Sequence, residues 1–573
     1  MDGDLLTKTE TPRHRDDAGA DTRATASAIR RSGSRRVWNW LAGVPRWVWL
    51  TAVVVALVHM APNWMAAANA PEGWTHTGIM SSSPDYMQYR VWMRQAMEEG
   101  PVVSNRFTTE PNARYLPVGL YWGIGHAAAI TGLSPEWTYA WLGAVVAIVF
   151  VLLLFETVRL FSPGPRATMW TVGILLVGGG LGGYVRYLQE SPWAWENSII
   201  WKLLLSPLRE GDPGPVFDYY RGNYIVQAIF DTHFLVFWTM TTAAVLLLYH
   251  TATRFSALRL AATATAFGFA TFLHVYEGLT LIMIAAGALL LSWRKGMAGR
   301  RALLIWIVCT AAAGACLLAV AYLYMNSGLP APEWRGPNVM PSILFTAYPL
   351  AWLVIAWGGA RFWVEADVRQ AFVAGWAAGC LAMILAAPFF PYPNRGTMSL
   401  QIPLYVIAAI IYFRNHQRLT LPALVATVLL LGSTPVLMAF QRADSIRFDA
   451  GSTYRWVSGD HAALTRELNT RATTNDVLLA QESVLRWLAP DYRGRHYAGH
   501  FFLTVDYDRK AERVAAFYRS MSAAERIEFL RDAGVRYFYV EAADDPAAFA
   551  SLPGVSTVAV RAIGTLFSFD PQP

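Results

Sequence analysis

The chain has 573 residues, of which 54% are hydrophobic and only 15% are charged. A soluble domain carries roughly 25% charged residues, so this composition excludes a disordered chain and argues against a purely soluble enzyme. The formal net charge is +7, and 13% of the residues are aromatic. The three cysteines, Cys309, Cys316 and Cys380, lie in apolar stretches and offer neither a disulfide framework nor the spacing of a zinc site.

The N-terminal segment 1–45 is polar and is predicted to be a disordered cytoplasmic tail. Arginines are concentrated at its end, between residues 30 and 46, with no acidic residue among them. Next to an apolar stretch such a cluster indicates membrane orientation rather than nucleic-acid binding. We therefore expect the N-terminus to lie in the cytoplasm and the first apolar stretch to remain as an uncleaved span.

Apolar stretches of membrane length recur along residues 46–440. A transmembrane helix needs roughly 20 mostly apolar residues. The fold class predicted is an all-α polytopic membrane protein of about eleven transmembrane helices. The expected spans are 47–64, 136–158, 168–185, 224–250, 258–275, 277–293, 302–325, 341–360, 370–389, 399–413 and 420–440.

The apolar segment 115–132 is ambiguous, and the basic loops decide its interpretation. Lysines and arginines gather in short loops after the spans that end near 158, 250, 293, 360 and 413. These loops all fall on one side of the membrane only if 115–132 does not cross it. We therefore interpret this segment as a juxtamembrane or re-entrant helix, which leaves a large first outer loop at 65–135.

The last part of the chain, 441–573, has a different composition, because charges return and the long apolar stretches stop. Strands are predicted at 477–480, 535–540 and 555–560, and helices at 459–470, 508–520 and 523–533. Ser522 followed by Glu525 is a capping box that opens the last helix. The prediction is a small extracytoplasmic α/β domain.

Asp85 is the main candidate for chemistry in the first outer loop. It opens the segment 85–99, which has the pattern of an amphipathic helix on the membrane surface. A carboxylate at this place can simply cap the helix. The alternative is a general base that faces a cavity at the membrane edge.

Other ionisable residues lie within or at the outer ends of predicted spans, where such groups are costly and usually functional. Asp231 and His233 form one pair, and His274, Tyr276 and Glu277 lie in an outer hairpin. The structural alternatives are that Asp231 and His233 pair with each other or with a neighbour, and that the second group is an ordinary solvated hairpin.

Two arginines are candidates for binding a phosphate. Arg395 is the only charged residue between Arg369 and Arg414, and its planar guanidinium suits a phosphate. It can equally be an arginine that extends to the membrane interface. Arg335, in the preceding outer loop, is a weaker candidate of the same kind.

With these residues in view, the chain resembles the GT-C superfamily of integral membrane glycosyltransferases, which includes protein O-mannosyltransferases and aminoarabinose transferases. The resemblance covers about 45–440. It rests on Pro84-Asp85-Tyr86, on Arg114-Tyr115-Leu116-Pro117, on His274 to Thr280, and on Asn394-Arg395 through Gln401-Ile402-Pro403-Leu404.

The resemblance implies sugar transfer from a polyprenyl-phosphate donor to an extracytoplasmic acceptor, which can be a lipid, a glycan or a protein. It implies that Asp85 is the catalytic base and that the reaction inverts the anomeric carbon. Gln401 becomes a polar cavity candidate. Many members carry an acidic pair in the first outer loop, whereas Tyr86 follows Asp85 here. No cofactor is therefore expected, although a divalent metal is not excluded.

Tyr497 and His500, in the C-terminal part, are candidates for the acceptor side, or else ordinary residues of a strand and its turn. The expected location is the inner (plasma) membrane, with the C-terminal domain outside the cytoplasm. A multi-span transporter or flippase of a lipid-linked or small polar substrate is the alternative function, since it would also have many spans and buried acids.

Overall fold

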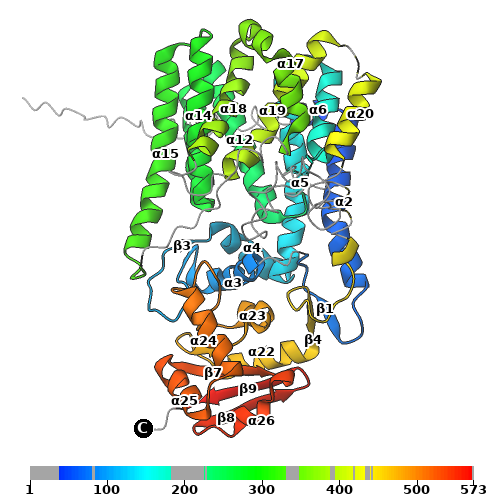
Figure 1. Ribbon diagram of the computed structural model, residues 1–573. Helices are drawn as coiled ribbons and strands as arrows, with labels where there is room; N and C mark the ends of the chain where they lie inside the picture. Colours follow the sequence, from blue (N-terminus) through cyan, green and yellow to red (C-terminus); the bar gives the residue numbers. More distant parts are fainter. Residues whose placement is uncertain are drawn as a thin grey trace, which may run out of the picture.

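The computed structural model describes residues 38–80, 84–181, 225, 229–330, 347–386, 394–416, 418, 420–432, 436, 439 and 443–570. Long helices form one end of the molecule, and a sheet with short helices forms the other (Figure 1). Helices α3 (Pro84–Glu99) and α4 (Gly119–Thr131) lie between the two. These two helices of the first outer loop therefore lie between the helical part and the C-terminal region 443–570.

A helix lies at the place of each predicted span. Six of the described helices, α2, α5, α12, α14, α15 and α18, are long and apolar enough to cross a membrane. The total of about eleven crossings stays a prediction. The bounds are α2 Arg46–Ala68, α5 Pro135–Phe161, α6 Pro165–Val177, α12 Thr232–Thr253, α13 Ala257–Leu273, α14 Val275–Arg294, α15 Gly299–Met325, α17 Pro349–Glu365, α18 Val368–Leu385, α19 Asn394–Asn415 and α20 Leu421–Leu431.

Helix α4 is too short to cross a bilayer alone. Its 13 residues span about 20 Å at 1.5 Å per residue, against a hydrocarbon core of about 30 Å. Gly132 ends the helix in the left-handed conformation, with φ 73°, which a glycine adopts without strain. This geometry supports the interpretation of 115–132 as a helix at the membrane edge.

Helices α14 and α18 pack closely through glycines. A Cβ atom on Gly287 would lie 2.2 Å from the carbonyl oxygen of Gly375, and one on Gly379 would lie 2.2 Å from that of Met283. Small residues at such positions let two backbones approach inside a membrane, where packing rather than water exclusion drives association. This contact fixes α14, whose first turn carries Glu277.

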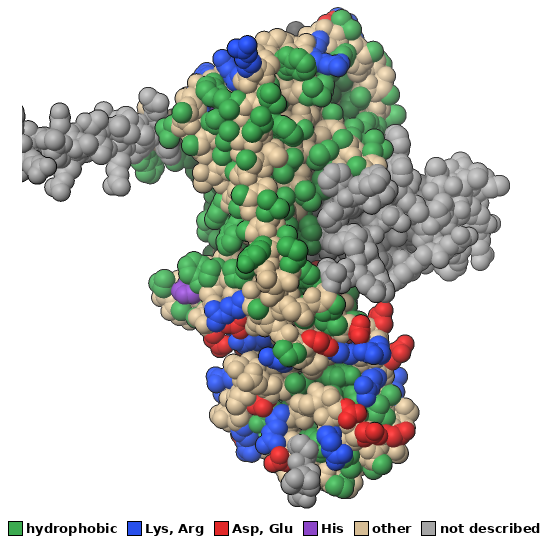
Figure 2. Space-filling view, turned by 90° about the vertical axis from the view of Figure 1, so that its left-hand side faces the viewer, with side chains coloured by type: hydrophobic (Ala, Val, Ile, Leu, Met, Phe, Trp, Pro, Cys, Tyr) green, Lys and Arg blue, Asp and Glu red, His purple; other side chains and the backbone are tan. Residues whose placement is uncertain are grey.

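On the face shown in Figure 2, lysine and arginine side chains gather at the end of the helical part remote from the C-terminal region, and the surface below them is largely apolar. That distribution agrees with the basic loops counted in the sequence. The cytoplasmic side assigned to this end remains a prediction.

The C-terminal region contains a five-stranded mixed sheet in the order β6-β5-β7-β9-β8. Strands β6, β5 and β7 are parallel, and β9 pairs antiparallel with both β7 and β8. The predicted capping box at Ser522 and Glu525 is confirmed. The bounds are α22 Gly459–Arg471, β5 Val477–Leu479, α23 Glu482–Leu488, β6 Arg495–His496, α24 Tyr507–Arg519, α25 Ala523–Asp532, β7 Val535–Glu541, α26 Pro546–Ala550, β8 Val555–Arg561 and β9 Gly564–Phe569.

Backbone pairing joins the first outer loop to the C-terminal region. Strand β1 (Trp74–His76) pairs antiparallel with β4 (Trp456–Ser458), and Thr108 forms an isolated bridge with Ala498. A second pair within the loop links β2 (Val102–Val103) to β3 (Leu116–Pro117). Side-chain contacts also connect the first outer loop to the C-terminal region.

Two polar contacts between the first outer loop and the C-terminal region are short, and one histidine at this contact, His496, is fully buried. Lys510 Nζ lies 2.7 Å from Glu110 Oε1, and the Asn105 amide donates to the Leu503 carbonyl at 2.6 Å. His496 stacks on Phe107, and burial lowers the pKa of His496 to about 3. The loop and the C-terminal region are thus held together by sheet pairing, ion pairing and a neutral histidine.

Candidate functional site

Helix α3 presents Asp85 in its first turn, at the edge of the helical part. Pro84 is the first residue of this helix, a position where its missing N–H costs nothing. The amide dipoles of the first turn stabilise the Asp85 carboxylate. The Asp85 side chain is 46% exposed, so a substrate can reach it.

His500, from the C-terminal region, faces Asp85. Its Nε2 atom lies 3.7 Å from Asp85 Oδ1, and its side chain is 0% exposed. The Nδ1 atom of the same ring accepts the Phe502 N–H at 3.2 Å. Because an accepting nitrogen carries no proton, the neutral ring must carry its proton on Nε2, toward Asp85. The structure thus brings together one residue predicted as base and one predicted for the acceptor side.

A stack of aromatic rings leads from α3 to the ends of the long helices. The Tyr89 ring stacks on Tyr121 of α4, with centroids 5.0 Å apart, and on His233 of α12, with centroids 4.7 Å apart. The Tyr121 hydroxyl lies 2.7 Å from His233 Nδ1. Tyr86, the neighbour of Asp85, packs against Tyr89. The His233 candidate is therefore connected to the Asp85 helix through stacked rings.

Asp231 is the N-cap of α12. Its Oδ1 atom accepts the His233 N–H at 3.0 Å and the Phe234 N–H at 3.4 Å, as a capping carboxylate does. The Tyr139 hydroxyl lies 3.4 Å from the same oxygen and accepts the His233 N–H at 2.8 Å. These contacts agree with the structural alternative, in which Asp231 pairs with its neighbours.

His274 and Glu277 continue the polar chain deeper toward α14. The rings of His233 and His274 lie 5.2 Å apart, and His274 Nδ1 lies 3.7 Å from Glu277 Oε1. Glu277 is buried and accepts a hydrogen bond from Thr241 at 2.8 Å. Tyr276 meets the His274 ring edge-on at 5.2 Å. This buried arrangement differs from a solvated hairpin.

The remaining candidates lie elsewhere or outside the described residues. Gln401 is fully buried in α19, where its Oε1 accepts the Ile225 N–H at 3.3 Å. Tyr497 lies in the core of the C-terminal region, packed against Phe529. Arg335 and the side chain of Arg395 are outside the described residues, so both stay predictions.

An ion-pair network beside the site was missed by the sequence reasoning. Glu136, at the start of α5, accepts from Arg90 Nε at 2.9 Å and from Arg94 Nη1 at 2.8 Å. Arg94 Nε also reaches Asp491 at 2.5 Å, and Arg90 donates to the Arg486 carbonyl at 3.1 Å. Arg90 and Arg94 are four residues apart, so they share a helix face. The sequence signal for this network was the four-residue spacing of Arg90 and Arg94, together with Glu136 at the start of the next predicted span.

In the described part of the chain, no group of three or more His, Cys, Asp or Glu side chains is arranged to hold a metal ion.

Two solved structures share the architecture described above. The first is the oligosaccharyltransferase of Archaeoglobus fulgidus, with a TM-score of 0.51 and 13% identity over 86% of this chain and 68% of that chain. The second is the arabinofuranosyltransferase AftD from Mycobacteria, with a TM-score of 0.52 and 14% identity. That match covers 91% of this chain but 41% of the longer AftD chain. No known family model and no curated protein sequence matches.

Both neighbours are GT-C superfamily glycosyltransferases. At these identities the likeness concerns the fold alone. Together with the apolar helices, it indicates a multi-pass membrane protein. The chain has the GT-C fold that its sequence resemblance predicts.

Proposed function

We propose that this protein is a membrane glycosyltransferase that moves a sugar from a polyprenyl-phosphate donor to an extracytoplasmic acceptor, with Asp85 as the base. The observation that carries the proposal is the position of Asp85. It lies half-exposed on α3, the helix between the helical part and the C-terminal region (Figure 1), with His500 of the C-terminal region opposite. The GT-C fold supports an enzyme rather than the transporter considered as the alternative.

The proposed reaction is a single displacement. An acceptor hydroxyl attacks the anomeric carbon while Asp85 takes its proton, and the bond from that carbon to the phosphate oxygen breaks. The polyprenyl phosphate leaves with the electron pair, so the anomeric configuration inverts. The leaving group needs charge stabilisation only, and Arg395, with Arg335 as the second candidate, is proposed to supply it.

We propose that the polar chain of His233, His274, Tyr276 and Glu277 lines the part of the substrate site that faces the membrane. His233 lies on α12, His274 is the N-cap of α14, and Tyr276 and Glu277 lie in the first turn of α14, beyond the stacked tyrosines of α3 and α4. Buried groups that both donate and accept hydrogen bonds suit the hydroxyls of a sugar. Asp231 caps the N-terminus of α12, and Gln401 of α19 accepts a hydrogen bond from the Ile225 N–H. We therefore propose a structural role for both residues.

His500 is proposed as a positioning residue for Asp85. A His500→Leu variant loses the Nε2–H group that faces Asp85. Its turnover should fall by roughly 10–10²-fold, because an Asp85 carboxylate that is not held in position is less often in the geometry that proton transfer requires. A His500→Gln variant keeps an N–H donor and should recover most of the turnover. The measurement is kcat and the donor KM at one pH, with the donor KM unchanged in both variants. Equal losses in the two variants would show that the ring only fills space.

The proposed function is tested by sugar transfer in liposomes. Purified protein with a labelled polyprenyl-phosphate sugar should release polyprenyl phosphate and label an acceptor on the side that exposes the C-terminal region. A flippase would move the donor across the bilayer with its sugar–phosphate bond intact. Donor movement without bond cleavage, over a panel of hexosyl and pentosyl donors, would therefore contradict the proposal.

A further inference from the structure

The hydroxyl of Thr504 lies within the turn that presents His500 to Asp85. Thr504 is 6% exposed, and its Oγ1 atom accepts the backbone N–H groups of Gly499 and His500, both at 3.0 Å. The same hydroxyl donates to the Phe107 carbonyl of the first outer loop at 2.6 Å. A hydroxyl has one donor and two acceptor sites. Thr504 therefore uses all three, two within the turn and one across to the outer loop.

Backbone contacts also hold this turn against the first outer loop. The Thr504 N–H donates to the His500 carbonyl at 2.8 Å, and the Gly499 N–H reaches the Phe107 carbonyl at 3.2 Å. A Cβ atom on Gly499 would lie 2.8 Å from Phe107 Cδ1 and 3.0 Å from Phe107 Cα. The absence of a side chain at Gly499 thus lets the turn approach the outer loop this closely.

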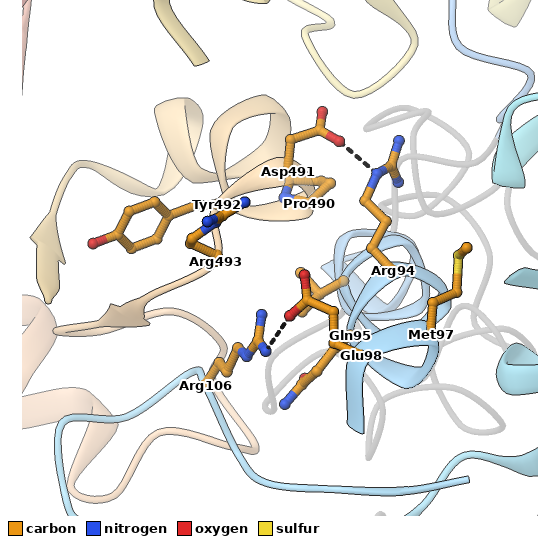
Figure 3. Close-up of a pocket in the computed structure, with 10 residues that line it drawn as sticks. Arg94, Gln95, Met97, Glu98, Arg106, Pro490, Asp491, Tyr492 and Arg493 are labelled. Atoms are coloured by element: carbon orange, nitrogen blue, oxygen red, sulfur yellow. Dashed lines mark hydrogen bonds and ion pairs between the residues drawn. The ribbon is translucent and has the colours of Figure 1, made fainter. Parts of the chain in front are cut away.

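The segment around Phe107 is attached to α3, the helix that carries Asp85. Arg106 Nη2 lies 2.8 Å from Glu98 Oε2, and Figure 3 shows this pair beside α3. Phe107 is fully buried in the same hydrophobic cluster as Met87, which follows Asp85 by two residues. The hydroxyl bond to the Phe107 carbonyl therefore connects the turn, through these contacts, to α3.

The His500 ring lies close to Asp85 but outside hydrogen-bonding distance, with 3.7 Å between Nε2 and Asp85 Oδ1. N–H···O bonds are about 2.7–3.2 Å long, so a displacement of about 0.5 Å toward Asp85 forms this bond and a similar displacement away prevents it. The ring moves with the turn, because its Nδ1 atom accepts the Phe502 N–H. The contacts that fix the turn thus decide whether the Nε2–H group reaches the carboxylate.

We propose that Thr504 is a positioning residue that sets the distance between His500 and Asp85. The inference rests on the proposed function, in which Asp85 is the base. It adds that the C-terminal region completes the site only while its turn stays bonded to Phe107. Because the turn acts on the base and not on the donor, the effect belongs to kcat rather than to the donor KM.

The first test is the turnover of Thr504→Val, which keeps the branched side chain and removes the hydroxyl. Its kcat should fall roughly tenfold with the donor KM unchanged, and Thr504→Ser should recover most of kcat. In a His500→Leu background Thr504→Val should cause no further loss, because it acts through His500. The matched control is Thr465→Val. Thr465 is also 6% exposed, but its hydroxyl donates to the His461 carbonyl within α22, so kcat should not change.

Gly499→Ala is a second, independent variant that displaces the same turn by steric contact and alters no polar group. It should lower kcat as Thr504→Val does, again with no further loss in the His500→Leu background. This variant decides the proposal if Thr504→Val does not fold.

Hydrogen exchange of the purified full chain, followed by mass spectrometry, tests the structural step without any transfer reaction. In Thr504→Val the His500 N–H loses the hydroxyl that accepts it, so it should exchange about tenfold faster than in the wild type at the same pH. The rate should recover in Thr504→Ser and stay unchanged in Thr465→Val.

Several results would overturn the assignment. They are full kcat in Thr504→Val or Gly499→Ala, no recovery in Thr504→Ser, an equal loss in Thr465→Val, a further loss in the His500→Leu background, and unchanged exchange at His500. Absence of sugar transfer by the wild type would instead refute the proposed function. The exchange rates would then still decide whether Thr504 holds His500 against the first outer loop.

Discussion

Asp85→Asn is expected to lower turnover by roughly 10²–10⁴-fold, the usual contribution of a general base. The substitution keeps the size of the side chain and its ability to begin α3, but an amide cannot take the acceptor proton. Because this contact matters most in the transition state, kcat and kcat/KM should fall together while donor binding stays close to the wild type. The assay is sugar transfer from a polyprenyl-phosphate donor in detergent or liposomes.

The matched control for this variant is Asp532→Asn, which neutralises an exposed carboxylate at the end of α25. It should leave transfer unchanged. Thermal unfolding of both variants should match that of the wild type, because the Asp85 side chain is half-exposed and supports no core. Full activity of Asp85→Asn would remove the base assignment and most of the case for this reaction.

The helices were predictable because a membrane helix is a local feature of the sequence. About twenty apolar residues in succession identify it without any knowledge of its neighbours. For the short helix α4 hydropathy alone does not distinguish a span from a helix at the membrane edge, so its interpretation depends on the charges in distant loops and stays a prediction. Strand β9 was not predicted, and neither was the pairing of β1 with β4. Strands β1 and β4 have three residues each and lie far apart in the sequence, so they carry no local pattern and owe their structure to their pairing.

The sequence predicted individual residues of the candidate site but not which of them contact one another. Asp85, His274 and Glu277 stood out because charged groups near a membrane are costly. The contact of Asp85 with His500 depends on how the C-terminal region folds back against the first outer loop, which no spacing in the sequence shows. The tyrosines 86, 89, 121 and 139 were missed because each, taken singly, looks like an ordinary interfacial aromatic residue.

Glu136→Ala is expected to destabilise the protein by about 3–5 kcal/mol, the cost of leaving a buried charge without its partner. The side chains of Glu136 and Arg90 are 3% and 5% exposed, with 2.9 Å between their charged atoms. Truncation at Glu136 would leave the Arg90 guanidinium buried and uncompensated, whereas Arg94 would keep its contact with Asp491. The measurement is thermal unfolding in detergent, followed by intrinsic fluorescence.

The control is Glu467→Ala, which breaks the exposed pair between Glu467 and Arg471 and should cost at most about 1 kcal/mol. A double variant, Glu136→Leu with Arg90→Met, removes both buried charges and should recover most of the lost stability, since well-packed apolar groups can replace a buried pair. Recovery would show that Glu136→Ala loses stability because the Arg90 guanidinium is left unpaired, and not because the link between α3 and α5 is lost. Because α3 carries Asp85, the activity of the double variant then measures how far this network also sets the position of the helix. A Glu136→Ala variant as stable as Glu467→Ala would refute the buried network.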